Sequence, residues 1–145
     1  MTGYVYNSYL TGCANGSAPD LSGADIYVAL LDNTHVVDVD AHAFFDDVSG
    51  DEVSGTGYTA GGQALADTTV TQDDANNQAV FDATDVTWTT ATITARFAVI
   101  YQNTGTPSTS PLVCIWDFDL DKIAAGIDFS FMMNSSGILV FAQGT

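Results

Sequence analysis

The chain has 145 residues, of which 46% are apolar and 11% aromatic, so it is long enough to bury one core and too apolar for a disordered protein. Eighteen acidic residues, seventeen of them aspartate, stand against one arginine and one lysine, which gives a net charge of −16. Nucleic acids and anionic membrane surfaces both attract Lys and Arg, so this charge argues against either as a partner.

The kind of acid also carries information about the fold. Aspartate favours turns and strand ends over helix interiors, so the composition argues against an all-helical protein. The first residues lack the basic and apolar regions of a signal peptide. No apolar run approaches the roughly 20 residues of a membrane span. We therefore expect neither a signal peptide nor a membrane-spanning segment in the sequence.

The N-terminal part of the chain contains three predicted elements. Tyr4–Ala14 fits a short amphipathic helix ended by an Asn-Gly pair, and it also fits a strand. Asp25–Asp32 predicts a strand that is apolar on both faces, which its own domain or a partner must cover. Val37–Val48 predicts a short helix with Asp40 as its N-cap, because apolar residues recur at helical spacing.

From Val53 onward, short β-type runs alternate with turn residues, and Asp121–Gly126 is one of the predicted turns. The predicted strands are Gln63–Ala66, Thr68–Thr71, Gln78–Phe81, Val86–Trp88, Ala91–Tyr101, Leu112–Phe118, Ile127–Met132 and Ile138–Ala142.

Two of these strands alternate apolar and polar residues with a period of two. One apolar face is predicted to hold Ile93, Ala95, Phe97, Val99 and Tyr101, and the other Leu112, Cys114, Trp116, Phe118 and Leu120. We expect the second strand to be central, with Trp116 buried. The pattern predicts a single domain, 1–145, that is mainly β: an antiparallel β-sandwich or jelly-roll-like barrel with one or two short N-terminal helices.

The residues available for catalysis are few. Nucleophilic catalysis needs a base beside a Ser or Cys, and the only histidines are His35 and His42. No nucleophile motif accompanies them, and with seventeen aspartates a pair of carboxylates at a suitable separation means little. We predict a protein that is not an enzyme, with no catalytic and no cofactor-binding residues. A hydrolase that uses His42 with an aspartate is the weakest alternative.

Two groups of aspartates raise the question of a metal site. Asp117, Asp119 and Asp121 resemble the start of a calcium loop, with Asp128 at the twelfth position. Lys122 stands where that loop needs glycine, and the twelfth ligand should be glutamate. A second group could hold a cation only by proximity. It consists of Asp38, Asp40, Asp46 and Asp47. We predict solvated aspartates and no metal.

Glycines and cysteines give weaker signals. Gly55-x-Gly57-x-x-Ala60 matches a dinucleotide-binding fingerprint only superficially, because no buried strand precedes it and no helix follows. We predict a tight turn that leads into the next strand. Cys114 lies in an apolar run and fits a buried thiol, whereas a disulfide with Cys13 stays open.

The aromatic residues divide into two groups. Those in strands are predicted to be core rather than a sugar-stacking platform, namely Trp88, Trp116, Phe97, Phe118, Phe129 and Phe131. The segment Tyr4–Tyr9 has few core-like neighbours. We therefore predict that the N-terminal segment, 1–24, packs on a partner or on the domain edge, with these tyrosines against another chain.

The order of features resembles a group of small virion structural proteins of tailed bacteriophages. The resemblance runs through Tyr6-Asn7-Ser8, Asp25–Leu31, Asp38–Val48, Glu52–Gly62 and Thr92–Arg96, and its most specific part is the glycine-rich stretch. It implies a capsid decoration or cement protein at the capsid surface of the virion. The implied partner is the major capsid protein, with homo-oligomers on the shell. The chain departs from the group in its shortage of lysine.

Two other functions stay open at this level. One is a different position in the virion: tail, neck or host-contact apparatus. The other is a carbohydrate-binding β-sandwich, which predicts that Trp88 or Trp116 lies flat on the surface.

Overall fold

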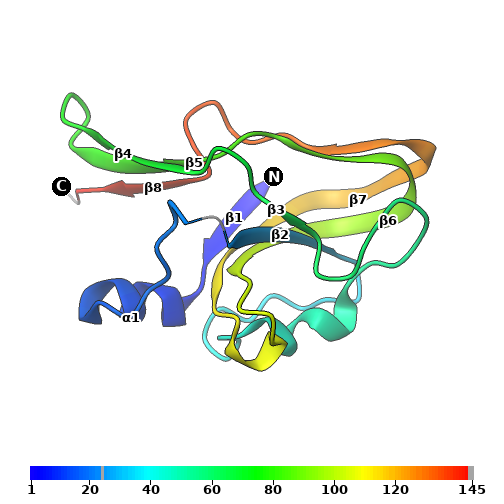
Figure 1. The fold of residues 1–145 in the computed structure, drawn as a ribbon, viewed down its shortest axis with the longest axis horizontal. Helices are drawn as coiled ribbons and strands as arrows, with labels where there is room; N and C mark the ends of the chain where they lie inside the picture. Colours follow the sequence, from blue (N-terminus) through cyan, green and yellow to red (C-terminus); the bar gives the residue numbers. More distant parts are fainter. Residues whose placement is uncertain (24, 144–145) are drawn as a thin grey trace.

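The computed structural model describes residues 1–23 and 25–143, which form two antiparallel sheets, one α-helix and three short 3-10 helices (Figure 1). The larger sheet has the strand order β1-β7-β6-β2-β3 and the smaller β4-β5-β8. The strands are β1 Thr2–Val5, β2 Ile26–Leu31, β3 Gln63–Ala64, β4 Thr69–Asp73, β5 Gln78–Asp82, β6 Val86–Gln102, β7 Leu112–Phe131 and β8 Leu139–Ala142. The predicted mainly-β sandwich is confirmed.

The long hairpin of β6 and β7 dominates the larger sheet, and two predictions about it are wrong. Each of these strands was expected as two shorter ones, with 121–126 as a turn, but each runs without interruption. The turn-type residues make bulges instead. Thr90, Asp119 and Gly126 have φ of 50°, 64° and 73°, and the pairing register shifts near each of them.

The bulges also change which face a side chain occupies. Ile93 and Ala95 lie in one core, but Phe97 and Tyr101 lie in the other, because the register shifts between Ala95 and Phe97. The single apolar face predicted for this strand is therefore wrong. The same holds for β7. Leu112 and Cys114 lie in different cores and Leu120 is exposed.

The N-terminal segment combines the two expected conformations. β1 pairs with Cys114–Asp117 of β7, and helix α1, Asn7–Asn15, follows it directly. Gly16 ends the helix in the left-handed conformation, as predicted. Tyr6 and Tyr9 are buried by this chain, so the prediction that they pack on another chain is wrong for these two residues, whereas Tyr4 is 42% exposed. Residue 24, the last of the segment 1–24, lies outside the described residues.

The helix predicted over 37–48 is wrong. The region is a loop with two 3-10 turns, η1 Phe45–Asp47 and η2 Ser49–Asp51. Asp38 accepts hydrogen bonds from the Asp40 and Ala41 amides, and Asp47 accepts from those of Ala43 and Phe44. Aspartates that bind nearby amides in this way favour turns over a continuous helix.

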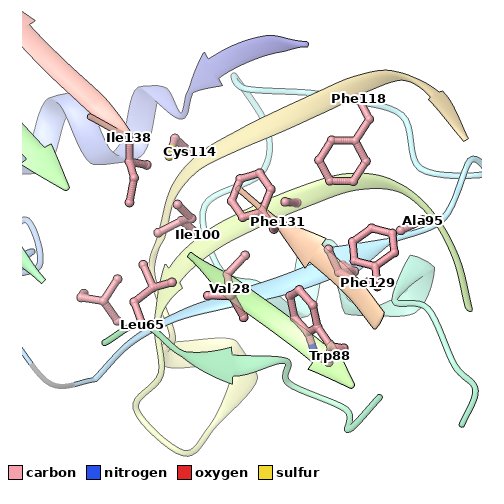
Figure 2. Close-up of a cluster of buried hydrophobic side chains, with 14 of the residues drawn as sticks. Val28, Leu65, Trp88, Ala95, Ile100, Cys114, Phe118, Phe129, Phe131 and Ile138 are labelled. Carbon is pink, nitrogen blue, oxygen red and sulfur yellow. The ribbon is translucent and has the colours of Figure 1, made fainter. Parts of the chain in front are cut away.

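Around β2, the chain itself covers both faces of the larger sheet. One core contains Trp88, Phe118, Phe129 and Phe131, with β5 and Ile138 packed against it (Figure 2). The other lies under the 32–51 loop. Strand β2 contributes to both, with Ile26, Val28 and Leu30 in the first and Ala29 and Leu31 in the second. The prediction of a strand buried on both faces is confirmed.

The glycine-rich stretch forms turns before β3, as predicted. Gly62 has a φ of 72°, and a Cβ there would lie 1.9 Å from the Val28 carbonyl oxygen. Glu52 organises the same loop, because its carboxylate accepts hydrogen bonds from the Tyr58 hydroxyl at 2.6 Å and the Gly61 amide at 2.7 Å. Burial raises the pKa of this carboxyl. The fingerprint glycines also serve backbone packing, because a Cβ at Gly55 would lie 2.1 Å from the Thr92 carbonyl oxygen and one at Gly57 would lie 2.9 Å from Ala91 Cα.

Candidate functional site

Strand β7 changes its surroundings midway. Its first part lies between β1 and β6, but β1 pairs only with Cys114–Asp117. From Phe118 to Phe131, no strand among the described residues pairs with the side of β7 that faces away from β6. We call this side the free edge of β7. Backbone N–H and C=O groups along such an edge are available to a further strand.

Apolar side chains gather along the free edge and its end. Among the described residues, four of the five most exposed large apolar side chains are Leu120 and Ile123, each 69% exposed, Met132 at 66% and Ile127 at 61%. Clustered exposed apolar groups mark contact sites more often than scattered ones do. The signal in the sequence was the run from Lys122 to Ile127, of which the residues up to Gly126 were interpreted as a turn and Ile127 as the start of a strand.

Apolar groups lie on both faces of the sheet at this edge. Ile123 pairs with Thr94 on the exposed face, whereas Ile127 pairs with the buried Ala91. Beside the edge is a hollow of about 470 Å³, lined by Phe118, Phe129, Phe131, Met1, Met132 and Lys122 among others. Its volume falls within the range of protein binding pockets, roughly 300–1,000 Å³.

The calcium-loop aspartates lie near this edge, each with a different partner. Arg96 donates from Nε to Asp117 at 2.5 Å and lowers the pKa of that carboxyl. Asp119 contacts the amino group of Met1, Asp121 accepts from Asn33, and Asp128 accepts from the Thr90 amide. Among residues 1–23 and 25–143, no three Asp, Glu, His or Cys side chains form a metal-binding group. The aspartates therefore give the edge a negative border.

The second aspartate group is dispersed in the same way. Asp38 and Asp47 bind backbone amides of their own loop, and Asp40 accepts from the side chain of Asn7. The amides of Phe44 and Ala43 lower the pKa of Asp47. These carboxylates shape the loop over the second core.

The two histidines lie together under this loop. His35 is buried, its Nδ1 lies 2.9 Å from an Asp51 carboxylate oxygen, and its ring centroid is 5.6 Å from that of His42. An Nδ1–H group on His35 can donate a hydrogen bond to this carboxylate, which favours that tautomer of the ring. His42 lies in a loop. The prediction of a helix over Val37–Val48, which would have placed His42 in its first turn, is wrong here too.

The aromatic residues are core, with one partial exception. Trp88, Phe97, Phe118, Phe129 and Phe131 are buried, as predicted. Trp116 is half-buried, and its ring lies over the backbone of Gly3, where a Cβ would come within 2.6 Å. The flat, exposed Trp88 that a sugar-binding platform would use is therefore absent.

The two cysteines are separate thiols, Cys13 exposed and Cys114 buried. Burial raises the pKa of Cys114 to about 12, so this thiol stays protonated and unreactive at neutral pH. No described helix has the length and apolar character that a membrane crossing requires.

Comparisons with known proteins found no match among protein-family models, curated proteins or solved structures.

Proposed function

We propose that this chain is a non-enzymatic virion structural protein, a capsid decoration protein that bridges neighbouring major capsid proteins on the outer shell. The observation that carries the proposal is the free edge of β7, where exposed apolar side chains line an unpaired strand. The resemblance described above supplies the setting. A decoration protein needs a rigid scaffold and an adhesive surface, and both features are present in this chain.

The charge supports the same role. Copies that carry a net −16 repel one another and stay soluble before assembly, while basic patches on a shell protein attract them. Many copies on a symmetric shell gain from avidity, so a modest affinity at each site suffices.

The proposal is tested on virions of the phage that encodes this chain. Quantitative mass spectrometry of purified particles should give a copy number comparable to that of the major capsid protein. Cryo-electron microscopy should place the chain over junctions between capsid subunits. A few copies per particle, with density at the tail or neck, would assign it to that apparatus instead. Absence from the particle would overturn the proposal.

A further inference from the structure

We infer that the free edge of β7 accepts a β-strand from a basic segment of the partner, which extends the five-stranded sheet beside Lys122–Phe131. The inference deepens the proposed function and rests on it for the partner's identity, a protein of the capsid shell. The mode of recognition rests on the backbone, the side chains and the charges of this edge.

The backbone of this part of β7 is suited to strand addition. The larger irregularity of the strand, around Asp119, lies before Lys122. Beyond it, Lys122–Ala125 and Ile127–Phe131 pair with β6, with one bulge at Gly126 and a second in β6 at Thr90. Recognition by strand addition takes affinity from backbone hydrogen bonds and specificity from pockets for alternate side chains.

The side chains at the edge supply such pockets. An added strand places alternate side chains on the two faces of the sheet. On one face they would meet Ala125, and on the other Phe129 and Phe131 beside the hollow of about 470 Å³, which Ile123 also lines. An apolar side chain of the partner can occupy part of this hollow.

The charges select a basic partner over a second copy of this chain. Asp121 and Asp128 border the edge, and the cations that the described part of the chain places there are Lys122 and the Met1 amino group, which already pairs with Asp119. Pairing two such edges would bring together carboxylates of two chains that each carry −16. Like charges at close range are unfavourable, whereas lysines or arginines on the partner strand complement the aspartates.

The first experiment maps hydrogen exchange on the purified protein with three capped peptides of about ten residues, long enough for one strand. One alternates valine with lysine, the second alternates valine with glutamate, and the third repeats the first with N-methyl groups on alternate amides. We expect only the first to slow exchange within 118–131. Equal protection by the N-methylated peptide, or protection elsewhere, would overturn strand addition.

The second experiment uses the variants Ile123→Asp and Ile127→Asp, with Val70→Asp in β4 of the smaller sheet as the matched control. All three positions are exposed, so the fold is expected to be retained. We expect at least a tenfold loss of affinity for the lysine peptide in the first two and little change in the control. Retained or increased affinity in all three would reduce the interaction to charge alone and overturn the inference.

The same variants separate this inference from the proposed function. Normal incorporation of Ile123→Asp into the capsid shell would leave the function standing and overturn the inference. Peptide binding at the edge by a chain that is absent from virions would overturn the proposed function and leave strand addition at this edge standing. Sedimentation velocity and hydrogen exchange without peptide test whether a second copy of this chain occupies the edge. A dimer that protects 118–131 by itself would replace the basic partner with a second copy.

Discussion

The two halves of β7 belong to one strand and are both rich in apolar residues, yet their surroundings differ. Leu112–Asp117 lies between β1 and β6 in the sheet, and Leu112, Val113 and Ile115 are completely buried. Phe118–Phe131 has one free edge and exposes Ile123 and Ile127. The comparison teaches that apolar residues in a strand serve stability or contact according to whether a further strand covers them. Four predictions test this distinction.

The largest expected difference is between Ile115→Ala and Ile123→Ala. Ile115 is completely buried, so its truncation removes packing and leaves a cavity, at a cost of about 3 kcal/mol of unfolding free energy. Ile123 is exposed, and the same change should cost less than about 0.5 kcal/mol. Urea denaturation followed by fluorescence measures both. Similar losses would mean that the free edge is stabilised by contacts within the chain.

Strand β1, which covers the first half of β7, Leu112–Asp117, can be disturbed at Gly3. A methyl group there meets the ring of Trp116 at 2.6 Å, so Gly3→Ala must displace either the indole or β1. Overpacking of this kind costs about 1–3 kcal/mol. We expect a lower midpoint in urea and a red-shifted Trp116 emission in a Trp88→Phe background. An unchanged spectrum and midpoint would show that β1 contributes little to this half.

The sequence was enough to predict strands in β6 and β7, and the failures within them have physical reasons. Period-two patterning identified β6 and β7, but it assumes an unbroken pleat. The bulges at Thr90 and Gly126 break this alternation. Trp88 and Ala91 lie in the same core although they are three residues apart, and Ala124 and Phe129 do so five residues apart. Turn residues predict a change of backbone direction, and they do not distinguish a bulge from a reversal.

The candidate surface was harder to predict for the same reason. Ile123 and Ile127 were interpreted as a turn and the start of a new strand, so the free edge between them could not be seen. The Val37–Val48 region failed differently. Its apolar spacing suits a helix, but the Asp47 carboxylate binds the Phe44 amide, which a helix beginning after Asp40 would direct to the Asp40 carbonyl.

Salt is expected to stabilise the whole chain by a smaller amount. Sixteen uncompensated negative charges repel one another, and the Debye length falls from about 10 Å at 0.1 M to about 3 Å at 1 M salt. We expect a gain on the order of 1 kcal/mol, or about 4 °C in the thermal midpoint. Calorimetry at the two NaCl concentrations measures it. An unchanged midpoint would mean that the aspartates, including those at the free edge, are already neutralised.

The smallest predicted effect concerns the ion pair at the boundary between the two halves. Arg96 lowers the pKa of Asp117 in the folded state. A lowered carboxyl pKa contributes stability above the unfolded value near 3.9, and this is lost as the pH falls through the folded value. Arg96→Gln should therefore be less stable than the parent chain at pH 7, and the difference should shrink below pH 4.

Lys122→Gln is the matched control for this pair, because both variants change the net charge from −16 to −17 and Lys122 makes no ion pair among the described residues. Its stability relative to the parent chain should vary less with pH between 7 and 3. Acid titrations at fixed urea, followed by fluorescence, compare the three proteins. Parallel curves for Arg96→Gln and Lys122→Gln would mean that Arg96 acts only through net charge. The boundary of the two halves would then depend on the strand β1 and the Asp119 bulge alone.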